Sequence, residues 1–124
     1  MGNKNLADTN IIIYFLKDEL PGNYLDFFDD SFAVSIVSKI EFLGWRGFDN
    51  ETYNEAKDFL ENVRIIILND DIVEKTIQLK RKFKIKTPDA IIAATCLVEN
   101  RNLITRNTKD FERISDLKII NPFL

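Results

Sequence analysis

The 124-residue sequence predicts an α/β fold, in which a central, mainly parallel sheet of four to five strands lies between layers of helices. Two observations carry this prediction. Short β-branched segments alternate with segments of helical periodicity, which favours parallel strands joined by helices. The composition is that of an ordinary globular protein, with 45% hydrophobic and 30% charged residues. Because the length suits one domain, we expect a single domain over residues 1–124.

The first half of the chain begins with a predicted strand over residues 5–8 that ends in the turn Asp8-Thr9-Asn10. A helix follows over residues 11–17, and Pro21-Gly22 interrupts regular structure. Asn50 is the expected cap of the last helix in this half. After the break we expect a short helix over residues 24–29 and a buried strand over residues 31–36. Two helices follow, over residues 38–47 and 51–62.

The second half begins with the β-branched run RIIIL at residues 64–68, which is typical of a strand. A helix over residues 72–83 is expected to start at Asp70 or Asp71. Thr87-Pro88-Asp89 predicts another helix, with Thr at the cap, Pro at the first helical position and an acid in the first turn. That helix runs to about residue 100, and two strands with a helical turn between them complete the chain, over residues 102–106, 117–120 and 108–114.

The absence of histidine excludes several classes of catalytic site. Ser-His and Cys-His nucleophile pairs, histidine acid–base chemistry and histidine-ligated zinc all require this residue. The single cysteine, Cys96, lies in an Ala-rich apolar segment, and we interpret it as an unreactive core residue. One cysteine suits a reducing cytosol. Because we find neither a signal peptide nor a membrane-spanning run, we expect a cytoplasmic protein.

Charge is distributed unevenly along the chain. The net charge is −3, but residues 1–79 carry 7 basic and 15 acidic side chains, whereas residues 80–124 carry 10 basic and 5 acidic ones. A basic region of this kind attracts a phosphate backbone. A solvated helix face with loops has the same composition, so both interpretations stay open at this point.

Four polar residues are expected to converge at one edge of the sheet. Asp8 follows the first strand, and Glu41 lies shortly after the second. Asp89 opens the helix that leads into the fourth strand, and Asn107 follows that strand. Ligands of parallel sheets bind at the carboxyl ends of the strands. An oxygen-only site there suits Mg²⁺ or Mn²⁺, which lower the pKa of bound water and neutralise a phosphodiester.

Each of these residues also has a purely structural interpretation. Asp8 is a good N-cap, Asp89 interacts favourably with a helix dipole, and Asn107 is a common turn residue. Asp110, three residues beyond Asn107, suits a helix start or a solvated position. These alternatives stay open when each residue is considered alone.

Glu41 is the hardest of the four to explain by structure alone. On the predicted helix it shares a face with apolar or small residues, namely Val37, Gly44, Trp45 and Phe48. Burying a carboxylate on such a face is costly unless a cation pairs with it, whereas a partly exposed face would let Glu41 reach water. Trp45 itself is interpreted as a core or interface residue.

Four stretches of the chain resemble the PIN-domain family and, within it, the VapC-type toxin ribonucleases of toxin–antitoxin pairs. They are LADTNIIIYFLK at 6–17, SIVSKIEFLG at 35–44, KTPDAIIAATCLVEN at 86–100 and LITRNTKDF at 103–111. They occur in the order that the family shows. The resemblance implies a PIN-like three-layer α/β/α sandwich, an acidic site for Mg²⁺ or Mn²⁺, and cleavage of single-stranded RNA.

The resemblance also assigns roles to individual residues. The family's acids fall on Asp8, Glu41 and Asp89, which would bind the metal, and its fourth position, often Asp in relatives, is here Asn107. Many VapC-like sequences read TRN at this point, so the amide does not imply inactivity. It weakens the case for a second metal ion, because an amide carbonyl is a neutral ligand.

Further residues are expected to assist this site. Asp110 is a secondary candidate acid, because it lies close to Asn107 in sequence. Thr9 and Thr105 match polar positions that support the family's acids by hydrogen bonds. The basic residues expected to hold the RNA backbone are Arg106, Lys86 and Lys109.

The predicted function is therefore a metal-dependent endoribonuclease that leaves a 5′-phosphate and a 3′-hydroxyl. The resemblance also implies a homodimer and a cognate antitoxin that inhibits it by inserting a peptide near the acidic pocket. One alternative is a non-catalytic PIN-like module that binds RNA or a partner, with Asn107 marking lost chemistry. The other is a receiver-like phosphotransfer domain, which is disfavoured because Asn69, not Asp, follows the RIIIL run.

Overall fold

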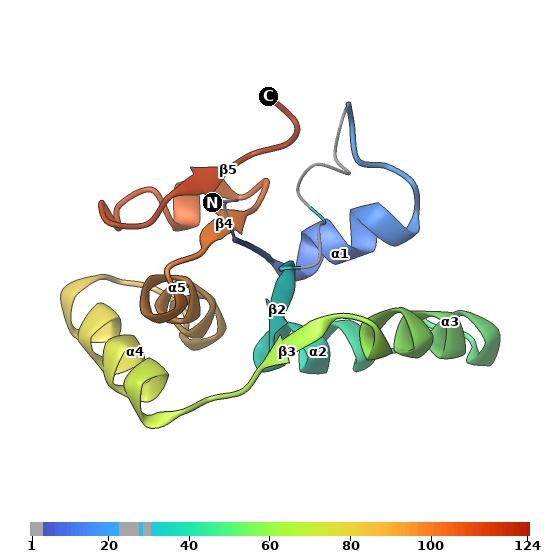
Figure 1. The fold of residues 1–124 in the computed structure, drawn as a ribbon, viewed down its shortest axis with the longest axis horizontal. Helices are drawn as coiled ribbons and strands as arrows, with labels where there is room; N and C mark the ends of the chain where they lie inside the picture. The colour runs from blue at the N-terminus through green and yellow to red at the C-terminus, as the bar shows by residue number, and fades with distance from the viewer. Residues whose placement is uncertain (1–3, 23–27, 29–30) are drawn as a thin grey trace.

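The computed structural model describes residues 4–22, 28 and 31–124 and contains a five-stranded sheet (Figure 1). Neighbouring strands pair in parallel, in the order β3-β2-β1-β4-β5. The prediction of four to five mainly parallel strands is therefore confirmed. The strands are β1 (Asn5–Ala7), β2 (Ala33–Ser35), β3 (Arg64–Ile66), β4 (Asn102–Ile104) and β5 (Ile119–Ile120).

Five α-helices and a 3₁₀ helix connect these strands in the described part of the chain. None of the helices found there has both the length and the apolar character needed to cross a bilayer. The helix expected over residues 24–29 lies outside the described residues, apart from Phe28. The helices are α1 (Thr9–Leu16), α2 (Ile36–Leu43), α3 (Asn50–Glu61), α4 (Asp70–Lys82), α5 (Thr87–Glu99) and the 3₁₀ helix η2 (Thr108–Asp110).

The sheet separates two hydrophobic cores, because successive strand residues point to opposite faces. Leu6 of β1 packs with residues of α4 and α5, whereas the next residue, Ala7, packs with residues of α1, α2 and α3. Figure 1 shows α4 and α5 on one side of the sheet and α1 and α3 on the other. This arrangement confirms the three-layer α/β/α sandwich. Cys96 is 1% exposed in the α5 core, and burial raises the pKa of its thiol, which supports its interpretation as an unreactive residue.

The cap of α3 lies one residue earlier than the sequence pattern predicts. Asp49, not Asn50, caps α3 by accepting a hydrogen bond from the N–H of Thr52 at 2.7 Å. The helix α4 starts at Asp70, as predicted, and Asn69 caps it by accepting from the N–H of Ile72 at 2.9 Å. Asn and Asp are nearly equivalent caps, so the local sequence did not distinguish between adjacent candidates.

The prediction that Thr87 caps α5 is wrong. The cap position belongs to Lys86, which makes no side-chain capping hydrogen bond, and Pro88 lies in the first turn, where a missing N–H costs little. The Thr87 hydroxyl instead accepts a hydrogen bond from Lys80 Nζ at 2.9 Å, and the same ammonium donates to the Ile85 carbonyl at 3.2 Å. These bonds tie the end of α4 to the segment that leads into α5.

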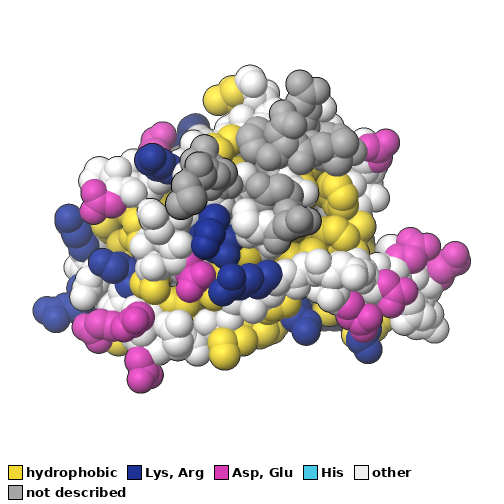
Figure 2. Space-filling view, viewed as in Figure 1, with side chains coloured by type: hydrophobic (Ala, Val, Ile, Leu, Met, Phe, Trp, Pro, Cys, Tyr) yellow, Lys and Arg dark blue, Asp and Glu magenta, His cyan; other side chains and the backbone are white. Residues whose placement is uncertain are grey.

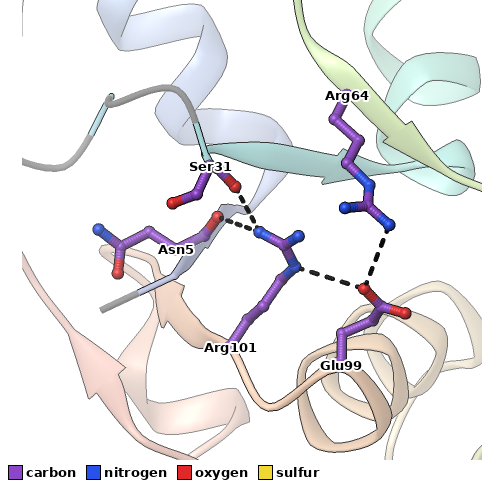
Figure 3. Close-up of polar contacts among 5 residues, drawn as sticks. All are labelled: Asn5, Ser31, Arg64, Glu99 and Arg101. Carbon is purple, nitrogen blue, oxygen red and sulfur yellow. Dashed lines mark hydrogen bonds and ion pairs between the residues drawn. The ribbon is translucent and has the colours of Figure 1, made fainter. Parts of the chain in front are cut away.

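A buried arginine joins several elements at the amino edge of the sheet (Figure 3). The Arg101 side chain is 1% exposed, and its Nη1 donates to the carbonyls of Asn5 at 3.4 Å and Ser31 at 2.5 Å. Its Nε lies 3.7 Å from Glu99 Oε1, which is also 3.7 Å from Arg64 Nη2. Arg101 therefore connects β1, the segment before β2, and the end of α5, while Glu99 extends the connection to β3.

Candidate active site

Asp8 is a buried carboxylate at the carboxyl end of β1, with 8% of its surface exposed. Its Oδ1 accepts from the N–H of Asn10 at 2.9 Å, and its Oδ2 accepts from Thr105 Oγ1 at 2.6 Å. Asp8 therefore caps α1 and also binds the residue that follows β4. Burial raises the pKa of Asp8, the hydrogen bonds with Thr105 and Asn10 oppose this, and the negative charges of Glu41 and Asp110 raise the pKa further.

Glu41 is exposed, so the second of the two interpretations of its helix face, in which Glu41 reaches water, is the correct one. The predicted helix face included Trp45 and Phe48. The helix α2 ends at Leu43, however, so both residues lie beyond it. Trp45 is 57% exposed. Glu41 therefore reaches water without needing a cation to offset its burial.

The hydroxyl of Thr9 holds Glu41 near the end of β1. Thr9 Oγ1 donates to Glu41 Oε1 at 2.7 Å and lies 3.1 Å from Ser38 Oγ. Because Thr9 follows Asp8 directly, this bond brings α2 and its carboxylate beside the Asp8 site. The negative charge of Glu41 accordingly raises the pKa of Asp8.

Asp89 lies half-buried in the first turn of α5. Burial raises its pKa, the negative charges of Asp110, Asp8 and Glu41 raise it further, in that order, and the positive charge of Lys86 opposes them. Four carboxylates, contributed by widely separated parts of the sequence, therefore repel one another at the carboxyl edge of the sheet.

Asn107 links Asp110 to the end of β4. Its side-chain amide donates to Asp110 Oδ2 at 2.5 Å, and its backbone N–H donates to Thr105 Oγ1 at 3.0 Å. The charge of Asp110 affects Asp89 more strongly than that of Asp8 does. Asp110 thus lies with the three main acids, and Asn107 is placed to position it.

A cavity of about 370 Å³ opens beside Asp89 and Asp110. Arg113 is held at its wall, because its Nη2 donates to the Lys84 carbonyl at 2.7 Å. The cavity combines two carboxylates with three cationic side chains, which suits a phosphate group bound near an acidic centre. Its remaining lining residues are Lys84, Ile85, Lys86 and Arg113.

Known proteins resemble this chain in sequence and in fold. The sequence model of the PIN domain matches residues 6–117. The chain belongs to the PIN domain family. Ribonuclease VapC1 of Methanocaldococcus jannaschii is 30% identical over 123 residues, which cover 91% of this chain and 82% of that protein. Ribonuclease VapC of Rickettsia bellii is 27% identical over 125 residues, which cover 93% of each chain.

A solved toxin–antitoxin complex from Klebsiella pneumoniae contains a chain with the same fold. The TM-score is 0.76 at 31% identity, and the match covers 95% of this chain and 97% of that one. The resemblance of the sequence to PIN domains and to VapC-type proteins is thereby confirmed.

The donor set of this PIN domain fits Mg²⁺ or Mn²⁺. The candidate ligands are all oxygen atoms. Burial and, after it, the negative charges of the neighbouring acids raise the pKa of Asp8 and of Asp89, and a divalent cation would relieve this repulsion. Within residues 4–22, 28 and 31–124, no three acidic, cysteine or histidine side chains already lie close enough together to hold a metal ion.

The three predicted RNA contacts occupy different surroundings. Lys86 lines the cavity, whereas Lys109 lies exposed in η2 and is not part of the cavity wall. The Arg106 guanidinium lies 4.1 Å from the centroid of the Phe123 ring and donates to the Tyr14 hydroxyl at 3.3 Å. Arg106 thus holds the C-terminal segment against α1.

Sequence reasoning missed Lys84 and Arg113 as residues of the site. Both belong to the basic second half of the chain, but they are 29 positions apart and meet through tertiary structure.

Trp45 was predicted to be either a core residue or an interface residue. It lies in an apolar groove with Ile13 and Leu16 of α1, so its core interpretation is wrong and its interface interpretation stays a prediction.

Proposed function

We propose that this PIN domain is a Mg²⁺- or Mn²⁺-dependent endoribonuclease that cleaves single-stranded regions of RNA in the cytoplasm. The observation that carries the proposal is the group of four mutually repelling carboxylates beside a cavity walled by Lys84, Lys86 and Arg113. The names of the two ribonuclease relatives, at 30% and 27% identity, support the same activity.

The carboxylates of Asp8, Asp89 and Glu41 would hold the metal ion, with Asp110 as a fourth acid. When bound, a divalent cation supplies an activated water and neutralises charge on the phosphodiester. The Thr105 hydroxyl fixes the orientation of Asp8. This arrangement leaves the second lone pairs of the Asp8 oxygens available to a cation.

The cations of the cavity would hold the RNA backbone. Lys84, Lys86 and Arg113 lie beside Asp89 and Asp110, so a phosphate bound among them would be adjacent to the acids. Arg113 suits this role because its guanidinium can bind two phosphate oxygens, and its bond to the Lys84 carbonyl restricts its position.

The proposal predicts metal-dependent cleavage of a mixed RNA pool. With Mg²⁺ or Mn²⁺ we expect products that carry a 5′-phosphate and a 3′-hydroxyl, and none with EDTA. Asp89→Asn should lower the cleavage rate by at least about 100-fold, because loss of a ligand costs at least as much as loss of a residue that orients one. Gel analysis and end-labelling measure both. Asp71→Asn, an exposed acid in the first turn of α4, is the matched control and should cleave normally.

The alternative module, which binds RNA without cutting it, predicts a different pattern. RNA would be retained in a binding assay, yet no cleavage would occur with either metal on transfer, ribosomal or messenger RNA. That result, obtained with folded and antitoxin-free protein, would overturn the proposed nuclease.

Metal binding is also expected to stabilise the fold. Because the carboxylates repel one another without a cation, EDTA should lower the melting temperature and Mn²⁺ should raise it. At a concentration of 100 times its Kd, a ligand adds about 2.7 kcal/mol, which corresponds to about 10 °C for a domain of this size. Differential scanning fluorimetry measures the shift. An identical shift in a variant that combines Asp8→Asn and Asp89→Asn would contradict binding at this site.

The proposed biological context is a toxin–antitoxin pair. The toxin–antitoxin complex from Klebsiella pneumoniae, which contains a chain 31% identical to this one, supports a small cognate antitoxin as partner. An inserted Arg or Lys would pair with the carboxylates and compete with the metal. We also propose a homodimer.

A further inference from the structure

An arginine close to the acids contacts two aromatic rings. The guanidinium carbon of Arg106 lies 4.1 Å from the centroid of the Phe123 ring and 5.6 Å from that of Tyr14. Its Nη1 also donates to the Tyr14 hydroxyl at 3.3 Å. The two rings pack edge to face with their centroids 4.9 Å apart. We call Tyr14, Arg106 and Phe123 the Arg106 cluster.

The backbone places the Arg106 cluster beside Asp8. Arg106 directly follows Thr105, whose hydroxyl donates to Asp8 Oδ2 at 2.6 Å. Tyr14 belongs to α1, the helix that Asp8 caps. The Thr105 N–H donates to the Ile120 carbonyl at 3.0 Å, which holds the end of β5 beside the end of β4. The cluster therefore forms where β1, β4 and β5 end, next to the proposed metal site.

The Arg106 cluster and the basic cavity lie on opposite sides of the acids. Ile85 of the cavity wall packs against the core beneath α4 and α5. Tyr14 and Phe123 pack against the other core, beneath α1, α2 and α3. These cores cover opposite faces of the sheet, and Asp8 follows its central strand. An RNA strand that runs from the cavity to Arg106 therefore crosses the acids.

The charge of Arg106 is available to a ligand. Within the part of the chain that the structure describes, no carboxylate lies at ion-pair distance from Arg106, and its side chain is exposed. Basic side chains on the face that Figure 2 shows lie among acidic ones. Arg64 and Arg101, for example, both lie 3.7 Å from Glu99. The rings thus hold the guanidinium of Arg106 on one side and leave the other side open.

We infer that the Arg106 cluster binds a nucleobase of the RNA strand, next to the phosphate at the metal site. Single-stranded RNA is recognised through bases that stack on aromatic rings and on guanidinium planes. The base stacks on the outer face of Arg106, while the inner face contacts Phe123 and the Tyr14 hydroxyl orients the group. The inference rests on the proposed nuclease function, and it replaces the predicted contact of Arg106 with the RNA backbone by a contact with a base.

The neighbours of Arg106 favour a base over a phosphate. Arg113 lines a cavity with Lys84 and Lys86, and such a group of cations suits a phosphate. Arg106 lies instead against two rings, and arginine together with aromatic side chains is typical of sites that stack the bases of single strands. Because every base has a flat face, this contact strengthens binding without requiring one sequence.

Two oligomers of equal length separate base binding from phosphate binding. One is oligo(A), and the other consists of stable abasic nucleotides, which keep the phosphates and present no base. Fluorescence anisotropy in Mg²⁺ measures the affinity of Asp89→Asn for each, since this variant leaves the strand intact. In that background, Arg106→Lys should weaken oligo(A) binding at least about fivefold and abasic binding less than about twofold, because Lys keeps the charge and loses the plane.

Three further variants in the same background complete the test. Arg113→Ala should weaken the binding of both oligomers by a similar factor, because the cavity contacts phosphate. Tyr14→Phe keeps the ring and removes the hydroxyl that orients the guanidinium, so its loss on oligo(A) should be smaller than that of Arg106→Lys. Arg46→Lys changes an exposed arginine beyond α2 and should alter neither affinity. Circular dichroism verifies that each variant is folded.

Three results would overturn the inference. Equal losses on both oligomers would make Arg106 a phosphate contact, and unchanged affinities would give it a structural role only. Oligo(A) that binds no more tightly than the abasic oligomer, or not at all, would exclude a base site. The proposed nuclease fails separately, because wild-type protein that leaves RNA uncut in Mg²⁺ would refute cleavage while the two affinities still decide the base site.

Discussion

Asp8→Asn is expected to lower the rate of RNA cleavage by at least about 100-fold and, in EDTA, to stabilise the protein at pH 7. The loss of activity follows because Asn replaces a charged metal ligand with a neutral one. The gain in stability follows because burial raises the pKa of Asp8, so its ionisation at neutral pH costs folding free energy. An Asn retains an acceptor for the N–H of Asn10, and the Thr105 hydroxyl can rotate to accept from its amide.

The sign of the pH dependence follows from linkage. A carboxyl whose folded pKa lies above its unfolded value of 3.8 contributes stability that is fully present below pH 3.8. That contribution is lost as the pH rises through the folded value. The pKa of Asp89 is raised as well, so Asp8→Asn should reduce this loss and not abolish it. Urea unfolding in EDTA, from mildly acidic to neutral pH, measures the difference.

Two controls separate the charge effect from other causes. Asp71→Asn removes an exposed carboxylate and should change neither activity nor the pH dependence. Excess Mn²⁺ should reverse the order of stability, because the wild type gains binding energy that the variant lacks. A variant that is less stable than wild type at pH 7 in EDTA would show that the hydrogen bonds of Asp8 outweigh its burial and repulsion.

The topology could be predicted from sequence because each element is encoded locally. Runs such as RIIIL and segments of helical periodicity alternate, and parallel connection is then the favoured arrangement. Element ends were less predictable, because Asp49 and Asn50 are adjacent residues with similar capping strength. Ile67 and Leu68 also belong to a strand by composition, yet the sheet ends at Ile66, since pairing with β2 and not β-propensity decides where a strand stops.

The residues of the candidate site could be predicted where the ends of the strands could be located in the sequence. Asp8 and Asp89 follow from the positions of β1 and α5, and the structure brings them within electrostatic reach of each other. For Glu41 the sequence left a buried and an exposed position open, although Gly44 is a common signal for the end of a helix and therefore favours the exposed one that the structure shows. The joining of Lys84 to Arg113 depends on tertiary packing that no local pattern encodes.

Arg101→Met is expected to destabilise the protein by about 3 kcal/mol while leaving cleavage by the folded variant near the wild-type rate. The side chain is buried, and its Nη1 donates to carbonyls that precede or begin two different strands, at Asn5 and Ser31 (Figure 3). A hydrogen bond from a charged donor contributes about 1.5 to 3 kcal/mol. Part of this hydrogen-bond stabilisation is offset, because burying the guanidinium is costly and its Nε makes no hydrogen bond. The same burial lowers the pKa of Arg101.

Arg101→Lys is the matched variant for this amino-edge cluster. Lys keeps the charge but lacks the planar fork that lets one guanidinium face Glu99 and the backbone carbonyls together, so an intermediate loss is expected. Urea unfolding measures stability, and cleavage at a temperature where each variant is folded measures activity. Arg101 lies at the amino edge of the sheet, whereas the four acids lie at the carboxyl edge. We therefore expect the stability of the variants to fall while their cleavage rate stays near that of the wild type. A variant of wild-type stability would mean that the cost of burying the charge cancels its bonds. Lost cleavage in the folded variant would instead mean that the amino edge controls the position of the acids.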